Sequence, residues 1–374
     1  MGNGKMNKSG EMRIKLSPLM LFVLLLISAL GMGFLTPYHD AIKICGPSAY
    51  LTAFAAFLLV LPALFLIFGL QRRFPEKNLL EAATATFGGG FGALLNLLFI
   101  AALIFQTFFV VRNTAELIST YSLNRTPLWA VIALIFTCSG FFAKNGLVGV
   151  SRMAGFVFIP AFLFRLFMLV FSIQGVKASH LLPVIAAQPY DYLKGGAPLV
   201  GVYVPWIIGL LFIYPLLSKP AKLKAIAGSL LGIQSVIIFC SIAIVVGIFG
   251  ASGAQSYIWP VFEAIRRNNI PLLALNQVGL IFLIVWFTMF LTGLSFMLYL
   301  YASGIARQFK NLNYHWCLGG TILITALGTG LIPTAFCDIQ VFIMLGRSAL
   351  VIVYAYPLLI YGGALLRGKG NKAG

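Results

Sequence analysis

The stretches LGMGFLTP at residues 30–37 and GGAPLVGVYVP at residues 195–205 decide the fold. Each one interrupts a long apolar run with glycine and proline, which open a helix because glycine adds backbone freedom and proline removes a hydrogen-bond donor. The two interruptions lie nearly half the chain apart. Broken helices at matching places in two halves are typical of transporters built from inverted repeats, in which half-helix ends face a bound solute. The alternative is that the glycines only permit close packing or a kink.

The composition around these breaks is that of a membrane protein. Of the 374 residues, 60% are hydrophobic and only 9% are charged, and the mean hydropathy is +0.99. A soluble domain cannot bury so much apolar surface, whereas lipid can cover it. The apolar runs are about 20 residues long, which is the length of a membrane-spanning helix and about twice that of a barrel strand.

The apolar runs therefore predict an all-α polytopic membrane protein with about ten transmembrane helices in one domain. The predicted spans are 17–37, 46–70, 90–111, 127–143, 148–172, 197–217, 223–249, 275–302, 317–334 and 339–365. With helices 1 and 6 broken, we expect two five-helix repeats, at about 17–172 and 197–367.

The net charge of +18 is divided among small basic clusters between the spans, which argues against a nucleic-acid partner. Lys and Arg are concentrated in every second connection, together with both ends of the chain. Because positive charge stays on the cytoplasmic side, both termini are predicted to be cytoplasmic.

The sequence contains no motif of a soluble enzyme. It has no nucleophile elbow, no His-Glu-x-x-His and no P-loop, and the three histidines fall in loops or at span ends. We therefore expect a protein that is not an enzyme, with no catalytic residues, no metal and no cofactor.

Four charged residues fall in or at the ends of spans, where each needs a reason because charge in lipid costs several kcal/mol, roughly. Arg112 and Glu116 are one helical turn apart and form either a structural pair or an outer gate. Arg347 is either paired in the interior, with Asp338 or Glu116, or grips a ligand carboxylate. Arg165 lies near the outer end of span 5, from which its side chain could snorkel to water.

Two further features concern the region around the breaks. Thr288, Thr292 and Ser295 lie roughly on one face of span 8, so they could face a cation beside the break in span 1 or merely bond to a neighbouring helix. In the connection at 250–274, apolar positions 258, 261, 262 and 265 predict a short helix capping the outer mouth, with Glu263 and Arg266 off its apolar face.

A series of short motifs, taken in order, resembles a known family. The motifs are LSP at 16–18, GMG at 31–33, RFPEKNL at 73–79, RNTAELI at 112–118, RTPLW at 125–129, LLPV at 181–184, YPLLSKP at 214–220 and YLYA at 299–302. Over about residues 12–305 the chain is similar to the spore-permease family, the integral B subunits of nutrient germinant receptors in endospore-forming bacteria.

This resemblance implies a LeuT-like fold of the amino acid–polyamine–organocation superfamily. It also implies a place in the spore inner membrane with an A subunit and a lipoprotein C subunit, and binding of an amino acid or similar nutrient that triggers germination. The implied ligand-binding residues at the two breaks are Gly31, Met32, Gly33, Phe34, Gly201, Val202, Tyr203 and Val204. Many members carry an acid after the second break, where this chain reads PWIIG at 205–209, so an uncharged or inorganic ligand stays open.

Three readings of function follow. The chain could be a receptor subunit that binds a nutrient and signals to partners, a secondary transporter of amino acids or related solutes driven by protons or Na⁺, or a scaffold with an empty site. The scarcity of titratable groups in the spans favours the receptor, because proton coupling usually uses an acid, Lys or His within the membrane.

Overall fold

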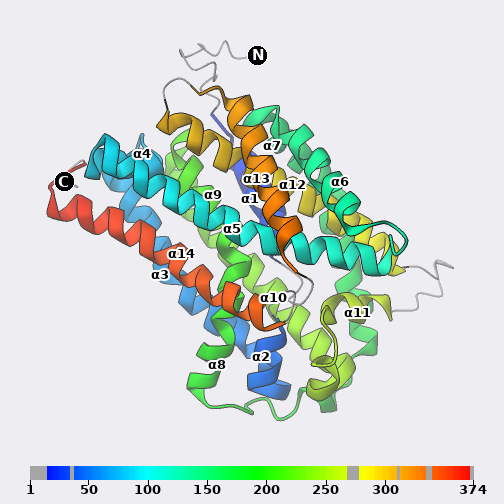
Figure 1. Cartoon of the computed structure of the whole chain (residues 1–374). Helices are drawn as coiled ribbons and strands as arrows, with labels where there is room; N and C mark the ends of the chain where they lie inside the picture. Colours follow the sequence, from blue (N-terminus) through cyan, green and yellow to red (C-terminus); the bar gives the residue numbers. More distant parts are fainter. Residues whose placement is uncertain (1–14, 34–37, 268–277, 310–311, 334–338, 371–374) are drawn as a thin grey trace.

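The computed structural model describes residues 15–33, 38–267, 278–309, 312–333 and 339–370, which form helices with short connections (Figure 1). The described residues form no strand beyond a single bridge between Leu16 and Leu217. The α-helices are α1 (Pro18–Met32), α2 (Tyr38–Cys45), α3 (Thr52–Arg73), α4 (Leu79–Phe87), α5 (Gly89–Tyr121), α6 (Leu128–Ala143), α7 (Gly146–Ser172), α8 (Pro189–Gly196), α9 (Val204–Ile213), α10 (Leu223–Ala254), α11 (Pro260–Arg266), α12 (Val278–Gln308), α13 (Tyr314–Leu331) and α14 (Ile339–Leu366). The 3₁₀ helices are η1 (Gly46–Leu51), η2 (Ile173–Gly175), η3 (Ala178–Leu181), η4 (Pro198–Tyr203), η5 (Tyr214–Leu216) and η6 (Pro220–Lys222).

A helix lies at each of the ten predicted spans. Within the described residues, seven helical stretches are long and apolar enough to cross a membrane, and α1 and α6 are shorter apolar helices. The helix α13 occupies the place of the ninth predicted span. The predicted connection between spans 1 and 2 differs from the structure, because its residues Tyr38–Cys45 form a helix, α2.

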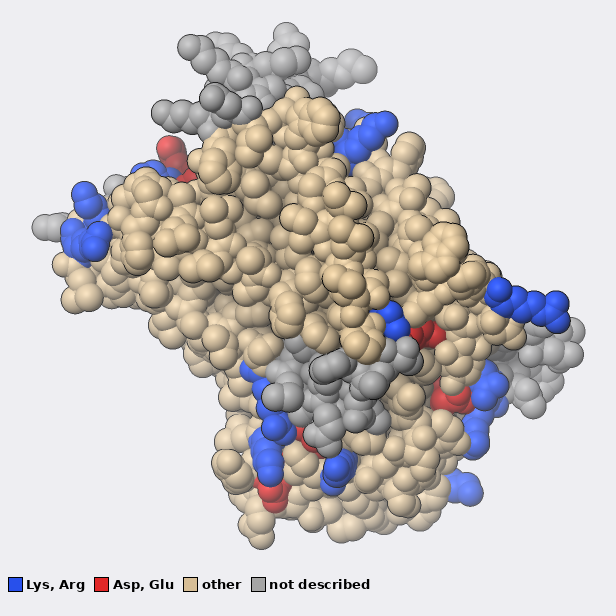
Figure 2. All heavy atoms as spheres, in the orientation of Figure 1, with Lys and Arg blue, Asp and Glu red and all other residues tan. Residues whose placement is uncertain are grey.

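The surface separates charge from apolar area in the way that a bilayer requires. Figure 2 shows the charged side chains on this face lying toward the ends of the molecule, with a broad uncharged area between them. Large exposed side chains such as Phe156 and Phe65 belong to long helices, and Trp129 belongs to the shorter helix α6. Such outward-facing apolar residues are stable against lipid tails and would be costly in water. The chain is a multi-pass membrane protein.

Two ends of the helix bundle are defined by contacts between distant segments. At one end, which we name the α4 end, Leu16 N–H donates to Leu216 O at 2.8 Å and Arg307 pairs with Glu81 of α4 at 2.7 Å. At the other, the α8 end, the hydroxyls of Ser48 and Tyr192 share a hydrogen bond of 2.7 Å. In Figure 1, α4 lies at the upper left and α8 at the bottom.

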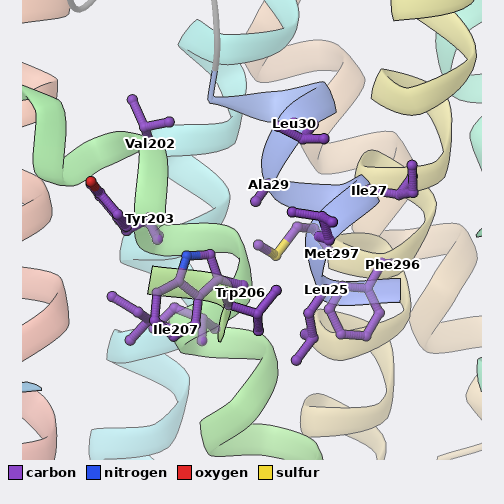
Figure 3. Close-up of a cluster of buried hydrophobic side chains, with 14 of the residues drawn as sticks. Leu25, Ile27, Ala29, Leu30, Val202, Tyr203, Trp206, Ile207, Phe296 and Met297 are labelled. Carbon is purple, nitrogen blue, oxygen red and sulfur yellow. The ribbon is translucent and has the colours of Figure 1, made fainter. Parts of the chain in front are cut away.

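The core is built on α1, α9 and α12. All ten residues of α9 are buried, and most of α1 is buried, so both helices can be apolar on every side. A side chain at Gly209 of α9 would place its Cβ 2.4 Å from Leu25 of α1 and 2.8 Å from Phe296 of α12. Figure 3 shows Leu25, Phe296 and Trp206 filling the space between these three helices. The two helices with the sequence breaks therefore cross at the centre of the molecule.

Candidate ligand-binding site at the broken helices

The first break separates α1 from α2. The helix α1 ends at Met32, and the N–H of Gly33 donates to Ala29 O at 3.1 Å as its C-cap. The next described residue, Tyr38, begins α2, and Phe34 lies outside the described residues. Helix 1 is thus formed of two helical pieces, as its glycines and Pro37 predicted.

The glycines before this break are required by the closeness of other backbones. A Cβ at Gly31 would lie 2.3 Å from Met289 O of α12, which is a contact that no side chain can make. A Cβ at Gly33 would lie 2.8 Å from the Cα of Val202 in η4. Figure 3 shows Val202 and Tyr203 beside the turn of α1 that carries Ala29 and Leu30. Gly33 and Val202, one residue from each break, are therefore in contact, whereas Gly31 packs on α12.

The second break is a tightened segment rather than an unwound one. Helix 6 consists of α8, η4 and α9, and η4 has the i→i+3 bonding of a 3₁₀ helix. Proline stands at the start of η4 (Pro198) and in the first turn of α9 (Pro205), and neither has an N–H to give to the preceding turn. A stretch of 3₁₀ helix within a longer helix often marks a functional hinge.

Side chains of α10 bond to this second break. The amide Nε2 of Gln234, which is buried, donates to Val202 O at 2.8 Å. One position along, the hydroxyl of Ser235 shares a 2.8 Å hydrogen bond with the hydroxyl of Tyr203. Gln234 is one of several neutral polar residues within the predicted spans. Its role was not predictable, because its partner is a carbonyl exposed by the break in another helix.

The helix α14 contacts one piece of each broken helix, η4 and α2. A Cβ at Gly346 would lie 2.6 Å from Pro198 O, so α14 packs directly on η4. The next residue, Arg347, pairs through Nη2 with Asp40 Oδ2 of α2 at 2.8 Å. The partner of Arg347 is thus Asp40, which was not among the predicted partners, and it is not Glu116. Asp338, the other predicted partner, lies outside the described residues.

The hydroxyls of Thr288, Thr292 and Ser295 bond within their own helix. They donate to the carbonyls of Val285, Thr288 and Leu291, at 2.6–2.8 Å. Their oxygens keep lone pairs that could face a cation, but the described residues include no group of three or more His, Cys, Asp or Glu suited to a metal. A cation site on this face of α12 stays a prediction.

Arg112 and Glu116 form the predicted pair, with Nε and Oε1 2.9 Å apart and both side chains largely buried. Between them on α5, Asn113 accepts a 2.9 Å hydrogen bond from the indole N–H of Trp259, the residue before α11. The pair therefore lies beside the residue that precedes α11. A gating role for it stays a prediction.

The short helix predicted in the connection at 250–274 is present as α11, but two positions differ from the prediction. Ile258 lies before the helix and is exposed, so it does not belong to the buried face. Val261, Phe262 and Ile265 are buried as predicted. Glu263 is buried too, because its carboxylate accepts from the hydroxyl of Tyr121 and pairs with Arg266 at 3.0 Å. The sequence could not show this, since Tyr121 lies far away at the end of α5.

Arg165 turns inward instead of snorkelling. Only 5% of the residue is exposed, and its Nη2 donates to the hydroxyl of Ser241 on α10 at 3.5 Å. It lines a cavity bounded by α7, α10, α11 and α12, which contains none of the break residues.

Two broken helices that cross at the centre of an all-α bundle define a transporter-like class of membrane protein. Two solved structures share this fold. One is Mhp1, a nucleobase-cation-symport-1 family transporter in a closed conformation with bromovinylhydantoin bound, with a TM-score of 0.64 and 14% identity over 96% of this chain and 81% of that one. The other is a Na⁺-coupled sialic acid symporter in a substrate-bound outward-open state, with a TM-score of 0.57 and 12% identity over 84% and 79%. The fold is LeuT-like.

The family follows from the sequence of the whole chain. A family model described as "Spore germination protein" matches residues 15–334, so the chain belongs to the spore germination permease family. In Bacillus subtilis (strain 168), Spore germination protein B2 is 22% identical over 358 residues, which cover 93% of this chain and 94% of that protein. Spore germination protein YndE is 22% identical over 330 residues, covering 87% and 89%. The expected resemblance is confirmed.

Proposed function

We propose that this chain is the membrane-embedded subunit of a spore germinant receptor, which binds a small nutrient between its two broken helices and signals germination. The germination role is supported by the family and by the names of its relatives. The observation that carries the binding role is the contact between the breaks, where Gly33 lies against Val202. A ligand bound there would touch both half-helices at once and could change how they pack.

An amino acid is the class of nutrient that suits these half-helix ends. Free N–H groups at a helix start attract a carboxylate, and free carbonyls attract an ammonium group. The proposed contacts are the eight residues predicted from the sequence, and no acid in the stretch 205–209 is available to bind the amine. The ligand amine would therefore depend on backbone carbonyls, which favours a small nutrient with few other charges.

The receptor would act in the spore inner membrane, with both termini in the cytoplasm and with A and C subunits as partners. The basic clusters support this orientation, since they follow the positive-inside rule. The division into repeats at 17–172 and 197–367 belongs to the same proposal. The family and the fold neighbours are permeases, receptors or transporters, which supports a function without catalysis.

The test replaces Gly201 with Leu, because a Cβ there meets its nearest neighbour, the Cα of Gly346, at 3.4 Å and can be accommodated more easily than at Gly31. We expect Gly201→Leu to reach the membrane and fold, and to lose the nutrient-induced rise in melting temperature of the purified protein. The matched control is Gly228→Leu, on the open surface of α10, where no atom lies within 4 Å of the added Cβ. If both variants respond equally to the nutrient, the binding pocket does not lie at these breaks.

A second candidate function is secondary transport of amino acids or related solutes, favoured by the likeness to two transporters. Uptake of a labelled nutrient against its gradient, by the purified chain alone in liposomes, would support it. Nutrient binding without uptake would favour the receptor.

A further inference from the structure

The cavity beside Arg165 has the construction of an anion site. Its walls come from α7, α10, α11 and α12, and they are mainly apolar side chains such as Met168 and Phe282. Among the described residues that line it, Arg165 is the only one with a charged side chain. Ser172 and Ser241 add hydroxyl groups to the same lining.

The guanidinium of Arg165 is fixed in position in this lining. The hydroxyl of Ser241 donates to Ile237 O at 2.7 Å and accepts from Arg165 Nη2, so it is a positioning group for the arginine. The phenol of Tyr38 and the thiol of Cys240 lie within electrostatic range of the same guanidinium. Since Tyr38 opens α2, the charge lies next to the outer piece of broken helix 1.

The acidic residue of α11 bonds to groups that do not line the cavity. Glu263 of α11 does not line the cavity, because its carboxylate is engaged by Tyr121 and Arg266. A cation among apolar side chains attracts anions strongly, because the low dielectric constant there screens the electrostatic interaction less than water does. The five N–H donors of arginine bind carboxylates and small anions through charge-assisted hydrogen bonds.

We propose that this cavity binds one small monovalent anion, either an inorganic ion such as chloride or the carboxylate of a small organic acid, at Arg165. The volume open to a water-sized group is about 20 Å³, which leaves room for one small ion or acid head and not for a larger molecule. The site goes beyond the proposed nutrient pocket, because none of residues 31–34 or 201–204 lines it. Its occupancy would neutralise the charge beside α2 and hold α7, α10 and α11 together.

The test is the line width of the ³⁵Cl NMR signal of chloride with the purified full-length protein in nanodiscs, since exchange with a bound site broadens this signal. We expect broadening by the wild-type protein, and Arg165→Met should weaken chloride binding about tenfold to a hundredfold, the worth of a hydrogen bond to a charged group. The matched control is Arg152→Met, an exposed arginine on the same helix, which should leave the broadening unchanged. Titration with acetate separates the two sources: reversal of the broadening assigns the site to carboxylates, and persistence assigns it to inorganic ions.

A second variant keeps the arginine and removes the space. Ala264→Leu on α11 fills the cavity, so it should also abolish the broadening even if Arg165→Met does not fold. Broadening equal to wild type in either folded variant, or none with the wild-type protein beyond empty nanodiscs, would overturn the proposal. Gly201→Leu should retain the chloride signal, so failure of the nutrient pocket and failure of the anion site are distinguishable.

Discussion

At the scale of single residues, the breaks are completed by side chains that come from other helices. Val202 O lies in a turn followed by Pro205, which has no N–H, and Gln234 supplies a donor at 2.8 Å. An unsatisfied buried carbonyl would destabilise the fold, so the hydrogen bond from the Gln234 side chain stabilises this local geometry.

We therefore expect Gln234→Leu to lower the stability of the protein by about 1–2 kcal/mol, because the buried carbonyl of Val202 loses this donor. The measurement is the melting temperature of the purified protein in detergent. Val236→Leu is the control, since Val236 is 61% exposed on the same helix and should change little. If the two variants have the same melting temperature, the hydrogen bond from Gln234 does not stabilise the break.

At the scale of elements, α14 joins η4 and α2, one piece of each broken helix. It packs on η4 at Gly346 and pairs with α2 through Arg347 and Asp40. The sequence did not predict α2, because the polar residues His39, Asp40 and Lys43 lie in the connection between predicted spans 1 and 2. Asp40 is tolerated in a buried helix because its partner lies 307 residues along the chain, and no local pattern reveals such a pair.

This ion pair should couple α14 to the nutrient response. Because the Arg347 side chain is 46% exposed, we expect the stabilising energy of the pair to be about 1 kcal/mol or less, yet its loss releases α2 from α14. Asp40→Asn and Arg347→Gln should each shift the nutrient concentration for half-maximal germination, and the double variant should shift it no further. The exchange Asp40→Arg with Arg347→Asp should restore part of the response. Additive effects of the two single variants would show that the residues act independently.

At the scale of the whole molecule, the sequence predicted the membrane class, the span positions and the two breaks, because each rests on long apolar runs or on glycine and proline within them. It did not predict where Arg165 and Glu263 point, since their burial depends on Ser241 and Tyr121 in distant helices. Local patterns thus determine where the chain crosses the membrane, and contacts between spans determine which polar groups face the interior.

The orientation in the membrane is the last property that the charge distribution predicts. Lys77 lies in the connection before α4, and Lys194 lies in α8 at the opposite end of the bundle; both are exposed. The positive-inside rule places the α4 end in the cytoplasm, because the larger basic clusters lie there with the chain termini. In a cysteine-free background, Lys194→Cys should react with a membrane-impermeant maleimide in intact cells, and Lys77→Cys should react only after lysis. The reverse labelling pattern would indicate the opposite orientation in the membrane. Nutrients from outside would then meet the α4 end of the two broken helices first.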